Sequence, residues 1–349
     1  MAAVTMRVLV TGGGGYIGSI LIPKLLDQGH SVLVFDRFFF GRETLRDHPR
    51  LEVVVGDTRR LSGDQFKDVN AVIDLAAISN DPSGDLFESA TWAINDRARV
   101  RCAQLAKEAG ARRYVLPSSC SVYGFQSAEV VATEDSPTNP LTTYAKANLA
   151  AESGVLALSD DQFCVAVARQ ATVYGYSPRM RFDLAINGMT YGAWKTGELP
   201  LMRDGSQWRP MVHVEDTAEA LIHLMTADES LVQGEVFNVG SEMNFYQIGQ
   251  LGSTVADTVA GDVSINWYGD PDHRSYRVSF EKIESTGWKA LRCAEDGIKD
   301  VAAALERGDT DRTPKTITLD WYKALVEFRS ILKDVELDGD LVDLPEDLT

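Results

Sequence analysis

The chain is poor in the residues that build metal centres and disulfide frameworks. Its 349 residues include four cysteines and five histidines, and neither set shows paired or metal-ligand spacing. The cysteines therefore favour reduced thiols in a cytoplasmic protein, and no metal is expected. Apolar runs as long as a membrane span are also lacking, and the N-terminal residues lead directly into an apolar strand instead of forming a secretory signal.

Positive charge is scarce as well. The 34 Lys and Arg residues are outnumbered by 51 Asp and Glu, which gives a formal net charge of -17. This charge argues against a nucleic-acid surface, because a phosphate backbone repels an acidic protein. An acidic protein that binds an anionic ligand must place its arginines locally, so arginines in apolar or glycine-rich surroundings are informative. Residues 334–349 contain no basic residue, and we expect a solvated acidic tail.

A glycine-rich turn follows the first apolar run of the chain. Residues 11–18 read TGGGGYIG, and a helical segment begins within them. Gly12, Gly15 and Gly18 keep the spacing GxxGxxG: the first allows a tight turn, the second lets backbone N–H groups approach a pyrophosphate, and the third lets the helix pack on the strand. The positive end of the helix dipole would face the phosphates.

An acidic residue ends the next apolar run, as dinucleotide binding requires. Asp36 lies eighteen residues after Gly18, and its carboxylate would accept hydrogen bonds from the ribose hydroxyls of adenosine. This favours NAD over its 2′-phosphorylated form, although the neighbouring Arg37 leaves NADP open. The sequence therefore predicts a dinucleotide site.

Apolar runs alternate with helical segments through the first half of the chain. We expect strands at Val8–Thr11, Ser31–Phe35, Leu51–Val55, Ala71–Leu75, Tyr114–Leu116 and Phe163–Ala168, and amphipathic helices at Trp92–Ala109 and Tyr144–Leu158. This alternation predicts an α/β fold of the Rossmann type, in which a doubly wound parallel sheet is covered by helices on both faces. A smaller C-terminal α/β lobe would bind the substrate.

The predicted domain boundaries follow a change in composition after Arg169. Residues 1–170 would form the dinucleotide-binding domain, and residues 213–240 would return to it through a helix at Glu215–Thr226 and a strand at Val236–Val239. Residues 171–212 and 241–333 would form the substrate-binding lobe.

Further motifs follow in a fixed order. They are Gly56-Asp57-Thr58, Leu75-Ala76-Ala77, Asn95, SSCSVYG at 118–124, Tyr144 at the start of a helix, Arg169 with Val173–Gly175, and Arg209 with Val212–Asp216. In these motifs the chain resembles the extended short-chain dehydrogenase/reductase superfamily, and within it the NAD-dependent nucleotide-sugar epimerases and dehydratases. The resemblance implies cofactor contacts from Gly12, Gly15, Tyr16, Ile17, Gly18, Asp36, Arg37, Asp57, Thr58, Leu75, Ala76, Ala77 and Asn95.

The resemblance also implies the catalytic groups. Tyr144 would remove a proton from a sugar hydroxyl while the nicotinamide takes the hydride from the same carbon. Ser119 would share the hydrogen bond to that oxygen, and Ser118 and Ser121 are adjacent candidates. A free tyrosine has a pKa of about 10, so the phenol needs help to act as a base near neutral pH.

This chain departs from the family where that help normally arises. The family usually has a lysine four residues after the tyrosine, and this chain has Asn148 there. Lys146 lies about 200° around the helix from Tyr144 and cannot simply substitute. Three explanations stay open: an asparagine variant with a less acidic Tyr144, compensation by a nearby arginine or by the oxidised nicotinamide, or weakened or lost redox chemistry. We favour the first two together.

The residues after Ser119 separate the reactions of the family. The 4,6-dehydratase branch has Asp-Glu where this chain has Cys120-Ser121, so elimination of water lacks an evident acid/base pair. We therefore expect epimerisation of a nucleotide-diphosphate sugar, at C4, through a transient 4-keto intermediate. The alternatives are a nucleotide-sugar reductase or dehydratase, and a non-catalytic protein that binds NAD or a sugar nucleotide.

Arginines supply the expected substrate contacts, because planar guanidinium groups suit phosphate oxygens. By resemblance, Asn187, Arg209 and Arg274 would contact the diphosphate or the sugar. Arg179 and Arg181 would bind an additional anionic or polyhydroxylated feature or would be solvated at the rim, and Cys120 completes the candidate set. The resemblance further implies a homodimer through a bundle of the helices Trp92–Ala109 and Tyr144–Leu158.

Overall fold

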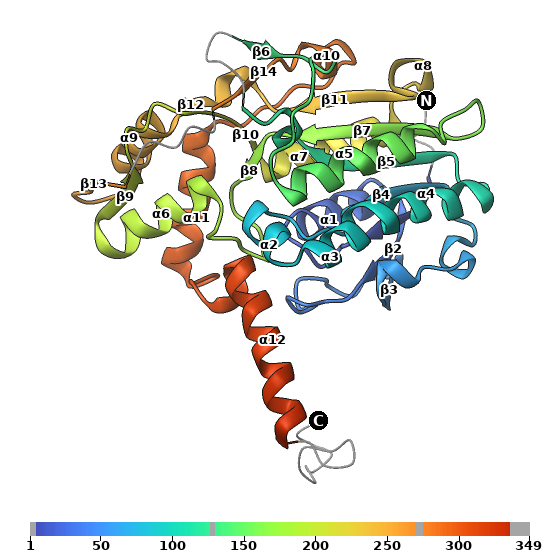
Figure 1. Cartoon of the computed structure of the whole chain (residues 1–349), viewed down its shortest axis with the longest axis horizontal. Coiled ribbons are helices and arrows are strands. Elements are labelled where there is room, and N and C mark those ends of the chain that lie inside the picture. Colours follow the sequence, from blue (N-terminus) through green and yellow to red (C-terminus); the bar gives the residue numbers. More distant parts are fainter. Residues whose placement is uncertain (1–4, 126–129, 270–274, 336–349) are drawn as a thin grey trace.

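The computed structural model describes residues 5–125, 130–269 and 275–335 (Figure 1). Its main sheet has seven parallel strands in the order β11-β7-β5-β4-β1-β2-β3. These strands are β1 (Arg7–Thr11), β2 (Ser31–Asp36), β3 (Leu51–Val55), β4 (Ala71–Asp74), β5 (Arg113–Ser119), β7 (Cys164–Gln170) and β11 (Glu235–Val239). Because the strand order reverses beside β1, the sheet is doubly wound, and the predicted Rossmann-type fold is confirmed.

Helices cover both faces of the main sheet (Figure 1). They are α1 (Gly18–Asp27), α2 (Asp81–Leu86), α3 (Glu88–Thr91), α4 (Arg99–Glu108), α5 (Thr143–Leu156), α7 (Val214–Thr226) and α8 (Glu229–Val232). Val8 and Val10 of β1 belong to a core cluster with α1 and α7, whereas Leu9 belongs to one with α4 and α5. A strand that is buried on both faces becomes a continuous apolar run, which is why these strands can be predicted from sequence.

The segment predicted as one helix at Trp92–Ala109 is more complex. Trp92–Ala98 forms a π-helical segment (η3), and α4 begins only at Arg99. A π-helical turn contains an extra residue and is often found near functional sites. It rotates the residues that follow, so the face presented by Arg99 cannot be derived from regular helical periodicity.

The second lobe contains small sheets. One has the order β12-β10-β8, and β9 pairs with β13 and β6 with β14. The strands are β6 (Val131–Ala132), β8 (Thr172–Tyr174), β9 (Glu198–Met202), β10 (Trp208–His213), β12 (Phe245–Gln247), β13 (Ser264–Tyr268) and β14 (Arg277–Val278). The helices are α6 (Ala185–Thr196), α9 (Ile248–Thr258), α10 (Glu281–Ser285) and α11 (Ala294–Arg307). Short 3-10 turns lie at Thr58–Arg60, Gly63–Phe66, Cys120–Tyr123, Glu242–Asn244 and Pro314–Thr316.

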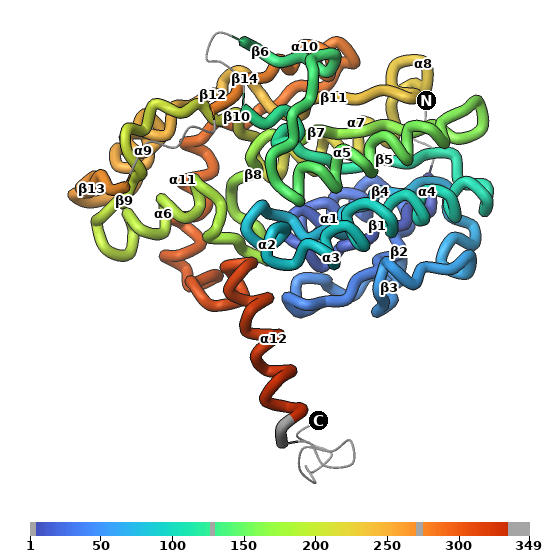
Figure 2. Tube along the Cα trace, in the orientation of Figure 1, coloured from blue at the N-terminus to red at the C-terminus, as the bar shows by residue number. Residues whose placement is uncertain are grey.

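The last helix, α12 (Thr318–Val335), projects away from the body of the protein (Figures 1 and 2). Its first turns pack on the segment that follows β2: the Trp321 indole donates to the carbonyl of Phe39, and the Tyr322 ring contacts Phe39, Phe40 and Phe87. Within the described ranges, none of the helices combines the length and the hydropathy that a bilayer crossing needs.

Candidate active site

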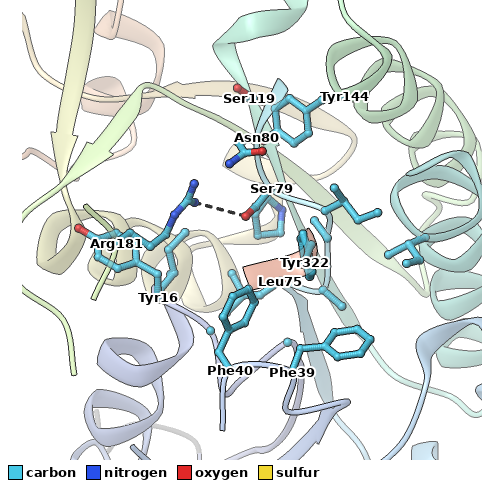
Figure 3. A pocket seen from close by; sticks show the side chains of 18 of the residues that line it. Tyr16, Phe39, Phe40, Leu75, Ser79, Asn80, Ser119, Tyr144, Arg181 and Tyr322 are labelled. Atoms are coloured by element: carbon cyan, nitrogen blue, oxygen red, sulfur yellow. Dashed lines mark hydrogen bonds between the residues drawn. The ribbon is translucent and has the colours of Figure 1, made fainter. Parts of the chain in front are cut away.

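A cavity of about 810 Å³ lies along the carboxyl ends of the strands in the main sheet. Its walls come from the segments that follow β1, β2, β4 and β5, from the start of α5 and from α12. Ligands of doubly wound sheets bind at this edge, close to the point where the strand order reverses. Figure 3 shows Ser119 and Tyr144 toward one end of the cavity and Phe39 and Phe40 toward the other.

The glycine turn has the shape of a phosphate cradle. Gly12 has φ +68°, and a Cβ there would lie 2.7 Å from the Ala76 nitrogen. A Cβ at Gly18 would lie 2.3 Å from the Gly13 carbonyl oxygen, so α1 packs closely on the turn. At Gly15 a Cβ would approach only the Gly12 oxygen, at 3.0 Å, and would otherwise enter the cavity. The turn therefore leaves room for phosphate oxygens at the N-terminus of α1.

Asp36 lies where the adenosine ribose of a dinucleotide would bind. Its carboxylate accepts hydrogen bonds from the backbone N–H groups of Gly14, at 2.9 Å, and Phe38, at 2.6 Å. Burial raises the pKa of Asp36. Arg37 turns to Asp57 and donates to its Oδ2 at 2.7 Å. Because the guanidinium of Arg37 is engaged with a carboxylate, this end of the cavity suits the unphosphorylated ribose of NAD.

Asn95 supports the cavity wall through hydrogen bonds to the backbone of Ile78, which lines the cavity. It donates to the carbonyl of Ile78 at 2.9 Å and accepts from the N–H of the same residue at 2.8 Å. Its side chain is fully buried and does not line the cavity in the described structure. The other predicted cofactor residues do line the cavity: Gly12, Gly15, Tyr16, Ile17, Gly18, Asp36, Arg37, Asp57, Thr58, Leu75, Ala76 and Ala77.

The structure brings Ser119 and Tyr144 to the same end of the cavity (Figure 3). Ser119 ends β5, and Tyr144 lies in the first turn of α5, which the Thr142 side chain caps by accepting from the Ala145 N–H at 3.2 Å. A Cβ at Gly84 would lie 2.9 Å from the Tyr144 Cβ, so α2 clamps the tyrosine from the side. Two hydroxyls on different elements thus converge on one space.

The environment of Tyr144 shifts its pKa in both directions. Burial raises it, the Arg99 guanidinium lowers it and the Asp81 carboxylate raises it. The polar side chains of Ser119 and Asn148 act in the same direction as Arg99. Ser121 also lines this end of the cavity, and its buried hydroxyl has no hydrogen-bond partner among the described residues.

Three further predicted residues lie behind the wall in the described structure. Asn148 is 1% exposed and accepts from Arg99. Cys120 is fully buried, and its thiol donates to the carbonyl of Arg169 at 3.2 Å. The Asn187 amide accepts from the N–H of Gly175 and donates to the carbonyl of Arg181 and to the Tyr16 hydroxyl. The side chains of all three residues bond to other parts of the protein and do not line the cavity in the described structure. The remaining candidate, Arg274, lies outside the described residues.

Arg179, Arg181 and Arg209 line the cavity as predicted candidates. Arg181 pairs with Asp183 at 2.7 Å and donates to Ser79 at 3.3 Å (Figure 3). Arg179 lies 3.6 Å above the Phe40 ring, next to α12, and its buried Nε and Nη1 have no partner among the described residues. Burial lowers the pKa of Arg179 to about 9. Such a guanidinium fits an anionic group, for example the pyrophosphate of a dinucleotide.

Sequence reasoning missed Arg99 and Tyr322. Both line the cavity, from α4 and α12 respectively. Arg99 follows a π-helical segment that cannot be predicted from a residue pattern. Tyr322 belongs to an ordinary amphipathic helix far along the chain. The three consecutive aromatics Phe38–Phe40 offered a signal that this region is covered, because such a run two residues after the predicted ribose acid is unusual for a solvent-exposed loop.

Comparisons with known proteins agree with this geometry. A model of the NAD dependent epimerase/dehydratase family matches residues 8–240. UDP-glucuronic acid decarboxylase 6 of Arabidopsis thaliana is 29% identical over 313 residues, which cover 84% of this chain and 87% of that protein. A putative UDP-glucose 4-epimerase of Methanocaldococcus jannaschii is 26% identical over 315 residues, which cover 84% of this chain and 96% of that protein. The structure of MoeE5 in complex with UDP-glucuronic acid and NAD is 28% identical, with a TM-score of 0.76, over 86% of this chain and 99% of that chain.

Proposed function

The chain belongs to the NAD dependent epimerase/dehydratase family, and from this premise we propose that it epimerises a nucleotide-diphosphate sugar at C4. The observation that carries the proposal is the position of Ser119 and Tyr144, which line the same cavity as the glycine turn and Asp36. The two hydroxyl residues lie toward the end opposite Phe39 and Phe40, which belong to the segment that follows β2 and Asp36 (Figure 3). A dinucleotide bound along the glycine turn would direct its nicotinamide toward the two hydroxyls. The name of the archaeal 4-epimerase relative supports the choice of reaction.

The residues of the chain provide the proton chemistry. Tyr144 as phenolate removes the proton from the C4 hydroxyl, and Ser119 holds the same oxygen by a hydrogen bond. NAD held along the glycine turn and Asp36 would supply the reversible acceptor for the C4 hydride. The phenol that results on Tyr144 gives its proton back once the sugar presents its opposite face. Arg209 lies at the cavity wall beside Tyr276, where its guanidinium would bind the diphosphate.

The side chains after Ser119 support epimerisation over dehydration. The Cys120 thiol is buried away from the cavity, and burial raises its pKa strongly. Ser121 offers a hydroxyl but no carboxyl group. Neither residue therefore supplies the acid and base that elimination of water from C5 and C6 needs.

Decarboxylation of a nucleotide-linked uronic acid is the second candidate. The plant relatives are named UDP-glucuronic acid decarboxylases, and MoeE5 was crystallised with UDP-glucuronic acid. Oxidation at C4 of such a substrate places a carbonyl group β to the C6 carboxylate, and a β-keto acid loses carbon dioxide readily. Arg181 in the cavity wall would bind the carboxylate, and Arg209 would still bind the diphosphate. This reaction shares its first step with epimerisation.

A product analysis separates these reactions. The purified protein is incubated with NAD at substoichiometric concentration and with UDP-, GDP-, dTDP-, CDP- and ADP-sugars, including UDP-glucuronic acid. We expect proton NMR to show conversion of one sugar to its C4 epimer without accumulation of NADH. Steady NADH accumulation would reject epimerisation in favour of a dehydrogenase, and release of carbon dioxide or water would identify a decarboxylase or a dehydratase. NAD binding without any turnover would indicate a binding protein.

Cofactor binding provides a prediction that does not depend on the sugar. We expect Gly15→Val to weaken NAD binding by roughly 100-fold or more, about 2.7 kcal/mol, because the added methyl groups enter the space for phosphate oxygens. Isothermal titration calorimetry measures the change. Gly63→Val is the matched control, since a Cβ at Gly63 meets nothing within 4 Å. Equal affinities of the two variants would show that the phosphates bind elsewhere.

Homodimerisation through α4 and α5 and a cytoplasmic location stay predictions. Light scattering on the eluting protein measures the first, and a mass of one chain at micromolar concentration would contradict it.

A further inference from the structure

Arg99 is a buried cation in the wall of the cavity, next to the proposed base. It is 4% exposed and lines the cavity from the first position of α4. Its Nε donates to the carbonyl of Ala76 at 3.3 Å, and its Nη1 donates to the Asn148 Oδ1 at 2.8 Å. Its Nη2 has no hydrogen-bond partner in the part of the chain that the structure describes. The guanidinium is therefore fixed on two sides and retains donor capacity.

Asn148 occupies the position of the family's lysine, yet it faces Arg99. Its side chain lies behind the cavity wall, and its Oδ1 accepts the hydrogen bond from the guanidinium. A lysine at 148 would bring a second buried cation against Arg99, which is unfavourable at short distance and low dielectric. An asparagine is neutral and offers an acceptor. The two residues are thus complementary. The family's cation is a lysine on α5, whereas in this chain the cation is Arg99 on α4 and residue 148 accepts its hydrogen bond.

We propose that Arg99 is the cation that activates the Tyr144 phenol in this chain, and that Asn148 is a positioning residue that keeps the Arg99 guanidinium at the cavity wall. This inference rests on the proposed function through the role of Tyr144 as base. The π-helical segment Trp92–Ala98 has a clear consequence here, because it sets the rotation with which α4 begins and so the direction of Arg99.

The other charged groups around Tyr144 do not replace this effect. Asp81 of α2 acts in the opposite direction and raises the pKa of Tyr144. Arg181 faces the same region but is paired with Asp183. Lys146 is exposed on α5 itself. Burial has the largest influence on the pKa of Tyr144 and raises it. Arg99 has the second largest influence and lowers it.

Asp74 of β4 faces Arg99 from the sheet. Its carboxylate accepts hydrogen bonds from the hydroxyls of Thr11 and Tyr114, and burial raises its pKa while Arg99 lowers it. The guanidinium therefore influences both a buried carboxyl group and the phenol, and its hydrogen bonds in the described structure go to Ala76 and Asn148 instead.

Three variants test the proposal: Arg99→Met, Arg99→Lys and the double variant Arg99→Met/Asn148→Lys. Loss of the cation disfavours the phenolate, so in Arg99→Met the acid limb of the pH profile of kcat/KM should move to higher pH by about one unit or more. Arg99→Lys and the double variant should return the limb toward its original position, because each restores one cation beside Tyr144. An unmoved limb in Arg99→Met, or no return in the double variant, would overturn the proposal.

A second readout needs neither cofactor nor sugar. Tyrosine labelled with 13C at Cζ reports phenol and phenolate by NMR, and Tyr144→Phe identifies the Tyr144 signal. At a fixed alkaline pH at which circular dichroism shows an intact fold, we expect a phenolate-to-phenol ratio about tenfold lower in Arg99→Met, the equivalent of one pKa unit. If the unchanged protein turns over no sugar nucleotide, the proposed function fails, and this measurement still decides the role of Arg99.

A more conservative variant covers the case in which Arg99→Met does not fold. Arg99→Gln keeps a side-chain N–H that can donate to the Asn148 Oδ1 but removes the positive charge beside Tyr144. The phenolate-to-phenol ratio should fall in this variant too, whereas an unchanged ratio would refute the assignment of Arg99.

Discussion

Replacing Tyr144 with phenylalanine should lower kcat by about 100- to 10,000-fold and leave the affinity for NAD within about threefold of its original value. The ring still fills its place against Gly84 and α2, so the fold is retained. What is lost is the oxygen that removes the proton from the sugar hydroxyl. Initial rates on the substrate found by the NMR screen measure the change, and calorimetry measures the NAD affinity.

A matched tyrosine separates chemistry from packing. Tyr268 of β13 is 53% exposed and does not line the cavity in the described structure, so Tyr268→Phe should leave kcat within about twofold of its original value. Full activity of Tyr144→Phe would remove Tyr144 as the base and would leave Ser119 and Ser121 as the polar groups to examine at this end of the cavity.

Replacing Arg169 with methionine should lower the free energy of unfolding by about 3–5 kcal/mol, because it leaves a buried carboxylate without its partner. Arg169 and Glu152 are 5% and 2% exposed, and Nη2 of the first lies 2.7 Å from Oε2 of the second. The Arg169 Nη1 also donates to the Tyr123 hydroxyl at 2.9 Å, and the Ser118 hydroxyl donates to Glu152. Urea denaturation followed by circular dichroism measures the loss.

Two comparisons make this prediction specific. Arg307→Met removes an exposed pair with Asp309 and should cost no more than about 1 kcal/mol. The double variant Arg169→Met/Glu152→Met removes both buried charges and should recover much of the stability lost in Arg169→Met. If Arg169→Met costs as little as Arg307→Met, the buried pair is not what stabilises this region.

The Arg169 network also connects stability to the site. Ser118 and Ser119 are adjacent at the end of β5, so the carboxylate that accepts from Ser118 lies directly behind the proposed catalytic serine. The thiol of Cys120, the residue after Ser119, also donates to the backbone carbonyl of Arg169. Arg169, which the sequence showed only as part of a family motif, therefore supports the backbone that presents Ser119, and it does not line the cavity in the described structure.

Local patterns were sufficient for the sheet and for the dinucleotide turn. The inner strands of a parallel sheet are buried on both faces, so each of them is an apolar run in the sequence. The predicted runs correspond to β1, β2, β4, β5 and β7 and to the partly exposed edge strand β3. The glycines at 12 and 18 are required by backbone approach within one strand-turn-helix unit. Such short-range requirements can be derived from residue spacing alone.

The direction of single side chains depended on the tertiary structure. Asn95, Asn148 and Asn187 belong to the expected motifs, yet their amides bond to Ile78, Arg99 and Gly175 behind the cavity wall. Conversely, Arg99 reaches the cavity from a segment that was predicted only as an amphipathic helix of a dimer bundle, and Tyr322 reaches it from a helix that was not predicted.

The sequence by itself therefore determined the doubly wound sheet, the glycine turn and the acid at its edge, and it pointed to the serine and tyrosine at the end of the cavity. Only the tertiary structure decided where the positive charge beside Tyr144 comes from. The reason is geometric: a π-helical segment sets the direction of Arg99 toward α5, and a contact between Arg99 and Asn148, which are 49 residues apart in the chain, leaves no periodic pattern in either helix.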